Sequence, residues 1–147
     1  MTVSEVKELF RQVRKAHSEI RHIMLMIQEE EANLLPKAIQ YDRDKVQVSV
    51  DDTLAKYAAE ITEMQEQLGK SLYTLKKSMT YAESLLTRLE DSDEREVMRY
   101  YYLDTNKGVL YKWFEVADLM GYDERTIYRI HGDALKHLSE KLSVNVS

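Results

Sequence analysis

The chain has 147 residues, of which 21 are Lys or Arg and 26 are Asp or Glu, so its formal net charge is −5. This length fits one domain or two very small ones. The acidic balance argues against a polybasic coat for nucleic acid, so any DNA contact must come from a local arrangement of charges. The absence of cysteine excludes disulfides and thiolate metal sites. No run of about 18 residues is free of charge, so we expect no membrane span.

The fold class is predicted to be all-α, because the chain contains only 4 Gly and 1 Pro and is rich in helix-forming residues. A long helix is predicted from Ser4 to Leu35, where apolar residues recur at intervals of three and four, as in a coiled-coil heptad. These apolar residues are Val6, Leu9, Val13, Ala16, Ile20, Ile23 and Ile27. Pro36 is expected to end the helix, since proline removes a helical hydrogen bond.

Residues 36–51 lose the helical period, and their VQVSV segment alternates as an extended segment does, which predicts a connector. A second long helix is predicted after the capping sequence Asp51-Asp52-Thr53. Its apolar residues again recur mostly at intervals of three and four: Leu54, Tyr57, Ile61, Met64, Leu68, Leu72, Leu75, Met79, Ala82, Leu86 and Leu89. Two such helices are typical of an antiparallel hairpin.

The same helices could equally pair with those of a second chain. A single hairpin has a thin core and would leave apolar residues such as Met24, Leu25 and Met26 only partly covered. We therefore expect a homodimer.

The composition changes after Glu90, which predicts a coiled-coil dimerisation region at residues 1–90 and a separate domain at residues 91–147. Asp91 or Ser92 is expected to cap a short helix through the sequence REVMRYYYL. The TNKG sequence at 105–108 should then break this helix, with its Asn and its Gly in left-handed backbone.

The sequence DLMGYDERTIYRI places a glycine between two helical runs. If Trp113 is the first residue of a helix-turn-helix, Ala117 is the fifth, Gly121 the ninth and Ile127 the fifteenth. The fifth position needs a small side chain, because the two helices approach most closely there. The ninth position needs glycine, because its φ is positive in the turn. The spacing therefore predicts a helix-turn-helix.

Asp123 is expected to cap the second helix of this motif, which should span residues 124–142. Residues near the start of such a helix reach base edges in the major groove. Arginine can donate two hydrogen bonds to a guanine, and threonine can contact a base or a thymine methyl. The predicted base-reading residues are accordingly Arg125, Thr126 and Arg129, and the predicted phosphate contacts are Lys112, Tyr128, Lys136 and His137.

The charge of the C-terminal third limits how many phosphates one copy can neutralise. Residues 91–147 contain 8 Lys or Arg and 11 Asp or Glu, a net charge of −3. A dimer that binds two half-sites about one helical turn apart would double the contacts.

The run WFEVADLMGYDERTIYRIHGDALKHL resembles the C-terminal helix-turn-helix of small phage-encoded transcription regulators of the RinA and ArpU type, itself similar to region 4 of sigma-70 factors. The shared features are an opening Trp113, Ala117, the Met-Gly-Tyr at 120–122 and the Tyr-Arg-Ile-His-Gly-Asp-Ala-Leu at 128–135. The segment 104–112 is longer than the corresponding connection in that family. The resemblance implies a regulator of phage or prophage genes, often late genes, in Gram-positive bacteria, and the absence of cysteine leads us to expect a reducing cytoplasm.

Two other functions stay open from the sequence. A phage packaging component of the small-terminase kind also joins a helix-turn-helix to a coiled oligomerisation region, although the order of the two is usually reversed. A sigma-like adaptor would contact RNA polymerase through the helical hairpin and use the C-terminal domain for protein contacts.

We expect no enzyme, no cofactor and no metal site. The histidines at 17, 22, 131 and 137 lack the spacing of a zinc hydrolase, and the chain has no phosphate-binding glycine loop. His131 is expected to fix the second helix of the motif against its neighbours, and Gly132 to permit a close helix approach despite its low helix propensity. The tyrosines at 100–102 and Trp113 are expected to belong to the core rather than to a base-stacking platform.

Overall fold

The computed structural model describes the backbone of residues 1–44 and 48–144 and the side chains of residues 1–33 and 52–143. Helices form most of this chain, which confirms the all-α prediction. Two compact units are present: one combines residues 1–18 with 74–147, and the other is 19–73. The start of the first long helix and the end of the second therefore belong to the same unit as the C-terminal third. The boundary between the units does not lie at residue 90. No helix in the described parts of the chain is long and apolar enough to cross a membrane.

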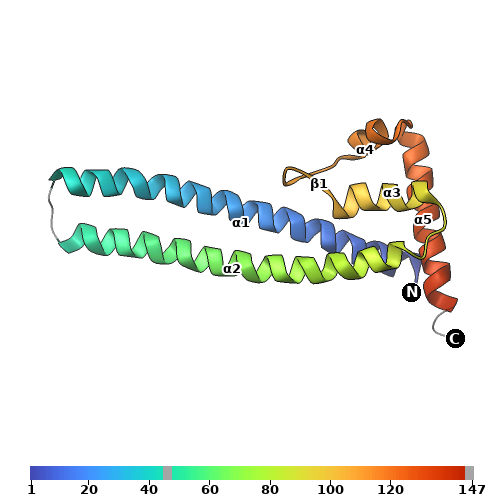
Figure 1. Ribbon diagram of the computed structural model, residues 1–147, viewed down its shortest axis with the longest axis horizontal. Coiled ribbons are helices and arrows are strands. Elements are labelled where there is room, and N and C mark those ends of the chain that lie inside the picture. Colours follow the sequence, from blue (N-terminus) through green and yellow to red (C-terminus); the bar gives the residue numbers. More distant parts are fainter. Residues whose placement is uncertain (45–47, 145–147) are drawn as a thin grey trace. The chain divides into compact units, whose positions relative to one another are not determined.

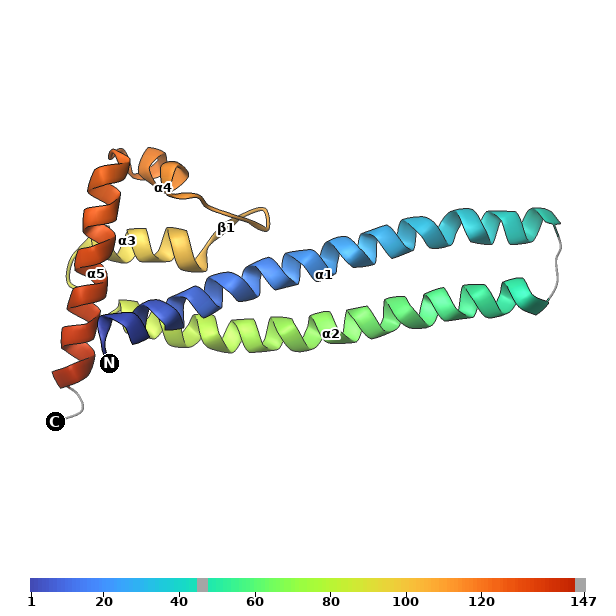
Figure 2. The same ribbon diagram turned by 180° about the vertical axis from the view of Figure 1, so that it is seen from behind.

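The first two helices are α1 (Val3–Asp44) and α2 (Val48–Leu86), which run antiparallel and pack together (Figures 1 and 2). The predicted helical hairpin is thus confirmed. In the unit 19–73 its buried apolar residues are Ile20, Ile27 and Ile61. The side chains at positions 24–26 are between 39% and 48% exposed, so this part of the hairpin has the thin core that was expected.

The predicted connector at 36–51 is wrong over its described residues. Helix α1 continues through Pro36 to Asp44, and α2 begins at Val48, inside the segment expected to be extended. Residues 45–47 lie outside the described residues. Proline raises the cost of a helix without forbidding it, and good helix formers surround this one. Valine in a helix costs at most about 0.7 kcal/mol more than alanine, so Val48 and Val50 add only a small cost to the start of α2.

In the other compact unit, the start of α1 and the end of α2 contribute a fully apolar seam. Its buried side chains are Val6, Phe10, Val13, Leu75, Ala82, Leu85 and Leu86. Phe10 directly follows Leu9 of the predicted heptad and was not itself assigned to the buried face, yet its side chain has no exposed surface. Its ring centroid lies 5.6 Å from that of Tyr102, which explains the burial.

Helix α3 (Ser92–Met98) begins where the sequence predicted, with Asp91 as its N-cap. The Asp91 carboxylate accepts hydrogen bonds from the backbone N–H groups of Asp93 at 2.8 Å and Glu94 at 3.2 Å. The chain continues as a short π-helix, η1 (Arg99–Leu103). Helix α3 packs against the long C-terminal helix α5 (Glu124–Val144), as Figure 2 also shows.

A small antiparallel hairpin of β1 (Thr105–Asn106) and β2 (Val109–Leu110) fills the segment that is longer than in the resembled family. Its turn uses positive φ at Lys107, 55°, and Gly108, 87°. Two left-handed residues match the type I′ turn that suits the twist of paired strands. The expectation that Asn106 would be left-handed is therefore corrected: that conformation belongs to Lys107.

Candidate nucleic-acid interface

Helix α4 (Trp113–Met120) ends at Gly121, whose φ of 74° and ψ of 26° lie in the left-handed region. The N–H of Gly121 donates to the carbonyls of Ala117 and Asp118, and the N–H of Tyr122 donates to Ala117 at 3.0 Å. These bonds satisfy carbonyls that the end of a helix otherwise leaves unpaired. The prediction that the glycine forms the turn is confirmed.

The second helix of the motif starts three residues after the glycine. The Asp123 carboxylate accepts the backbone N–H of Thr126 at 2.8 Å, which makes Asp123 the predicted N-cap. Hydrogen bonds from the Thr126 side chain and backbone hold the pKa of Asp123 below its ordinary value. The hydroxyl of Thr126 therefore serves the cap, and the residue is half-buried.

The two helices are held together by an apolar cluster on their inner faces. Its buried members are Val97 of α3, Val116 and Ala117 of α4, and Ile127 and Ile130 of α5. Ala117 is only 3% exposed, as expected for the small residue at the closest helix approach. Because these apolar positions face inward, the opposite side of α5 is left to polar side chains.

Aromatic rings extend this cluster toward the start of α1. The ring of Trp113 stacks on Tyr101 with centroids 3.6 Å apart and planes 13° apart, and the Arg14 guanidinium lies 3.8 Å from the Tyr101 centroid. Since two groups cannot share one ring face at these distances, Tyr101 lies between them. The guanidinium also donates a hydrogen bond to the Tyr101 carbonyl. Trp113 is therefore half-buried and packs against the apolar cluster, at the edge of the core in which it was predicted to lie.

Tyr102 and His131 form a buried polar pair within this cluster. The Tyr102 hydroxyl lies 2.7 Å from His131 Nε2, and both residues are less than 9% exposed. Burial lowers the pKa of His131 to about 4 and raises the pKa of Tyr102. His131 is accordingly neutral near pH 7, and its Nε2 shares one hydrogen bond with the Tyr102 hydroxyl, whose direction is set by the tautomer of the ring. This bond fixes α5 against η1, as expected for His131.

Three of the predicted DNA contacts lie together on the outer face of α5. Arg125, Arg129 and Lys136 are all exposed, and their spacing of four and seven residues puts them on one side of the helix. Arg129 makes only a 3.5 Å ion pair with Asp133, and both side chains are at least half exposed. An exposed pair of this kind contributes about 0–1 kcal/mol, so a stronger acceptor can displace the Asp133 carboxylate.

The predicted phosphate contact Tyr128 borders this face. Its hydroxyl donates to the Glu124 carboxylate at 3.1 Å, which raises the pKa of Tyr128. The edge of its ring meets Trp113 at a centroid distance of 5.5 Å, and the side chain is 48% exposed. Tyr128 thus joins the exposed face of α5 to the aromatic cluster.

The last two predicted contacts stand apart from Arg125 and Arg129. Lys112 precedes α4, and its backbone N–H donates to the Glu115 carboxylate at 3.0 Å while its side chain is exposed. His137 is bound through Nδ1 to Glu94, a carboxylate whose side chain is only 7% exposed. The Glu94 carboxylate accepts this hydrogen bond and so raises the pKa of His137, which means that this histidine first serves to neutralise a buried acid.

One expectation about this helix is wrong. Gly132 was expected to permit a close helix approach, but a Cβ built there meets no atom within 4 Å, and the residue is exposed. Sequence reasoning also missed the roles of Arg14 and Glu94. Their partners lie 87 and 43 residues away in the chain, a separation that no local pattern encodes.

No family model matches the chain, and searches of curated proteins and of solved structures likewise returned no match. The likeness to regulators of the RinA and ArpU type therefore stays a prediction. Within the described residues, no group of three or more His, Cys, Asp or Glu side chains could hold a metal ion.

Proposed function

We propose that this chain is a sequence-specific, double-stranded-DNA-binding regulator of transcription that acts on phage or prophage genes. The observation that carries the proposal is the left-handed turn at Gly121, after which Arg125 and Arg129 stand exposed on one face of α5. A helix presented in this way can enter the major groove. The phage context rests on the resemblance of residues 113–138 to regulators of the RinA and ArpU type.

In this proposal the first turns of α5 read bases. Arg125 and Arg129 each donate to a guanine, and the methyl of Thr126 packs against a thymine. Lys136, four residues beyond Gly132 on the same face, contacts a phosphate and sets the register of the helix on the duplex. Tyr128 lies at the edge of the face and can donate its hydroxyl to the adjacent strand once Glu124 releases it.

A homodimer is part of the proposal. The exposed Met24, Leu25 and Met26 give the unit 19–73 an apolar surface that a second copy could cover. Two copies would also place two α5 helices on half-sites about one turn of the duplex apart. Light scattering of the full chain at several concentrations measures the mass, and a monomer at every concentration would remove the dimer from the proposal.

The deciding experiment selects bound duplexes from a random-sequence pool with the full chain. The selected duplex is then titrated with wild type, with Arg129→Ala and with Arg21→Ala, which removes an equally exposed arginine from the unit 19–73. We expect Arg129→Ala to weaken binding by about 1–3 kcal/mol and to relax one base position. Arg21→Ala should bind as wild type does. A pool that yields no enriched sequence would refute the proposed function.

A second candidate function is the sigma-like adaptor, favoured by the exposed apolar side chains Phe114 and Leu119 of α4, each at least 50% exposed. Capture of RNA polymerase by the full chain in nuclease-treated extract would support it. A native mass of about eight or more subunits would instead support the small-terminase alternative.

A further inference from the structure

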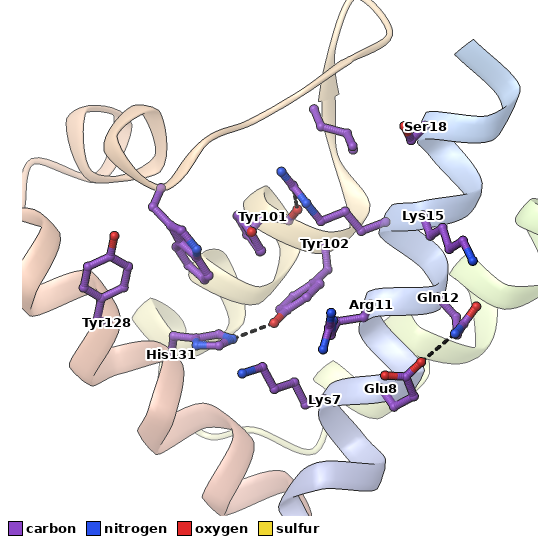
Figure 3. A pocket seen from close by; sticks show the side chains of 13 residues that line it. Lys7, Glu8, Arg11, Gln12, Lys15, Ser18, Tyr101, Tyr102, Tyr128 and His131 are labelled. Atoms are coloured by element: carbon purple, nitrogen blue, oxygen red, sulfur yellow. Dashed lines mark hydrogen bonds between the residues drawn. The ribbon is translucent and has the colours of Figure 1, made fainter. Parts of the chain in front are cut away.

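An open pocket of about 840 Å³ lies beside the outer face of α5 (Figure 3). One wall is the start of α1, and the other is formed by η1, β2, α4 and α5. All of its lining residues belong to the compact unit of residues 1–18 and 74–147. The pocket is therefore defined within one unit.

The α1 wall is strongly positive. Lys7, Arg11, Arg14 and Lys15 line the pocket, and the carboxylate on the same wall belongs to Glu8. Glu8 accepts a hydrogen bond from Gln12 at 2.6 Å rather than an ion pair from one of these cations. The facing wall adds no negative charge, because it consists of Leu110, three tyrosines, Trp113 and the buried His131.

Three of the four cations are unengaged. Arg14 is held against Tyr101, but among the residues that the structure describes, Lys7, Arg11 and Lys15 form neither an ion pair nor a side-chain hydrogen bond. All three are exposed. Figure 3 shows the side chains of Lys7 and Arg11 extending from α1 toward Tyr102 and His131.

The spacing of these cations indicates the kind of ligand. Lys7, Arg11 and Lys15 follow one another at intervals of four residues, which makes a straight row with steps of about 6 Å along one side of the helix. Like charges at this spacing destabilise a helix, so the row costs stability unless a polyanion neutralises it. An open, linear row suits a phosphate backbone better than a compact anion.

The position of the pocket indicates which phosphate backbone. Tyr128, which lines the pocket, lies three residues after Arg125 and directly before Arg129, so the pocket adjoins the face proposed to read bases. The charges also fit. Residues 91–147 carry a net charge of −3, whereas residues 1–18 contain 4 Lys or Arg and 2 Asp or Glu.

We propose that Lys7, Arg11 and Lys15 at the start of α1 bind the backbone phosphates of the duplex that flank the groove entered by α5. This inference rests on the proposed function and adds a DNA-binding surface outside the helix-turn-helix. The coiled-coil helix thereby supplies the positive charge that the helix-turn-helix lacks, and base reading and backbone binding come from opposite ends of the chain.

The test compares the full-length wild type with Lys7→Gln/Arg11→Gln, on the selected duplex and on an unrelated duplex of equal length. The logarithm of the binding constant falls linearly with the logarithm of salt concentration, and each phosphate contact adds about 0.9 to the steepness of this fall. The double variant should therefore show a slope that is shallower by about 2 units per protomer. For each protomer bound, its loss of affinity from about 50 to 200 mM salt should then be about tenfold smaller than that of wild type. Both duplexes should be weakened alike at low salt.

The matched control is Lys56→Gln/Lys70→Gln, which removes two exposed lysines of α2 that do not line the pocket. This variant should keep the wild-type slope. If wild type binds DNA but Lys7→Gln/Arg11→Gln keeps the wild-type slope, this inference is wrong while the proposed function stands. The same holds if the control variant loses as much slope as Lys7→Gln/Arg11→Gln. A wild-type chain that binds no duplex would overturn the proposed function and this inference with it.

A free nucleotide is the other source of phosphate. Trp113 lines the pocket and is the only tryptophan, so its fluorescence reports a ligand bound there. Saturable quenching by a mononucleotide at micromolar concentration, lost in Lys7→Gln/Arg11→Gln while the duplex slope stays unchanged, would overturn the assignment to DNA. We expect no saturable quenching in that range.

Discussion

The glycines at 121 and 132 should respond in opposite ways to the same substitution. Gly121 has a φ of 74°, and a side chain in the left-handed region costs about 1–2 kcal/mol. Alanine recovers about 0.4–1 kcal/mol by restricting the unfolded chain. No atom lies within 4 Å of an added Cβ, so no clash contributes. Gly121→Ala should therefore lower the free energy of unfolding by about 1 kcal/mol.

Gly132 provides the matched control, because it lies inside α5 with equally open space around its Cα. Alanine at an exposed helical position should raise the free energy of unfolding by about 0.5–1 kcal/mol. The two variants carry the same added atoms, so the difference between them, about 1.5–2 kcal/mol, isolates the backbone conformation of the turn.

Urea unfolding followed by Trp113 fluorescence measures this difference. Trp113 stacks on Tyr101 inside the helix-turn-helix, so its signal reports the unit that contains both glycines. With a slope of about 2 kcal/mol/M, the two midpoints should differ by about 1 M urea. If Gly121→Ala unfolds at the wild-type midpoint, the chain has no left-handed turn at 121, and the proposed presentation of α5 loses its basis.

Three further changes test the unit that holds the helix-turn-helix. Asp123→Ala removes the N-cap of α5 and should cost about 1 kcal/mol in the same urea assay; no loss would contradict the cap. Glu94 raises the pKa of His137 above its ordinary value of 6.5. The pair therefore stabilises the folded chain fully below pH 6.5, and this stabilisation is lost as the pH rises through the raised pKa of His137. The stability of wild type should thus fall more steeply from about pH 6 to 8 than that of Glu94→Gln, and parallel profiles would refute the pairing. Tyr102→Phe leaves Nε2 of the buried His131 without its hydrogen-bond partner and should cost about 1–3 kcal/mol, whereas a neutral effect would show that the bond does not form.

The helix-turn-helix was predictable because its determinants are local. A positive φ at Gly121, a small side chain at Ala117 and a cap at Asp123 each follow from neighbouring residues. The inward and outward faces of α5 follow from the helical period alone. For the same reason the exposure of Arg125 and Arg129 was correctly predicted, whereas their contact with DNA stays a prediction.

The predictions were wrong or incomplete where other residues outweighed a local sequence signal, or where no local signal existed. Pro36 signals a helix end, but the helix continues to Asp44, since a single proline is outweighed by the helix formers on both sides. Low helix propensity at Gly132 suggested a close contact that the open space around its Cα contradicts. The row formed by Lys7, Arg11 and Lys15 is visible in the sequence as a four-residue period. Only the fold shows that it lines one wall of an open pocket whose other wall carries aromatic rings.

The start of α1 cannot be separated from the C-terminal third as a folding unit. Phe10 packs on Tyr102, Arg14 on Tyr101, and the Ser139 hydroxyl donates to the Met1 carbonyl at 2.7 Å. Burying a large apolar side chain contributes about 1.5–3 kcal/mol, so loss of Val6, Phe10 and Val13 together would remove about 5 kcal/mol or more. Small domains have only about 5–15 kcal/mol in total. A fragment cut at residue 91 would therefore lose a large part of its stability along with the proposed phosphate row, so the stability and the proposed DNA contacts of the helix-turn-helix both depend on the first turns of the chain.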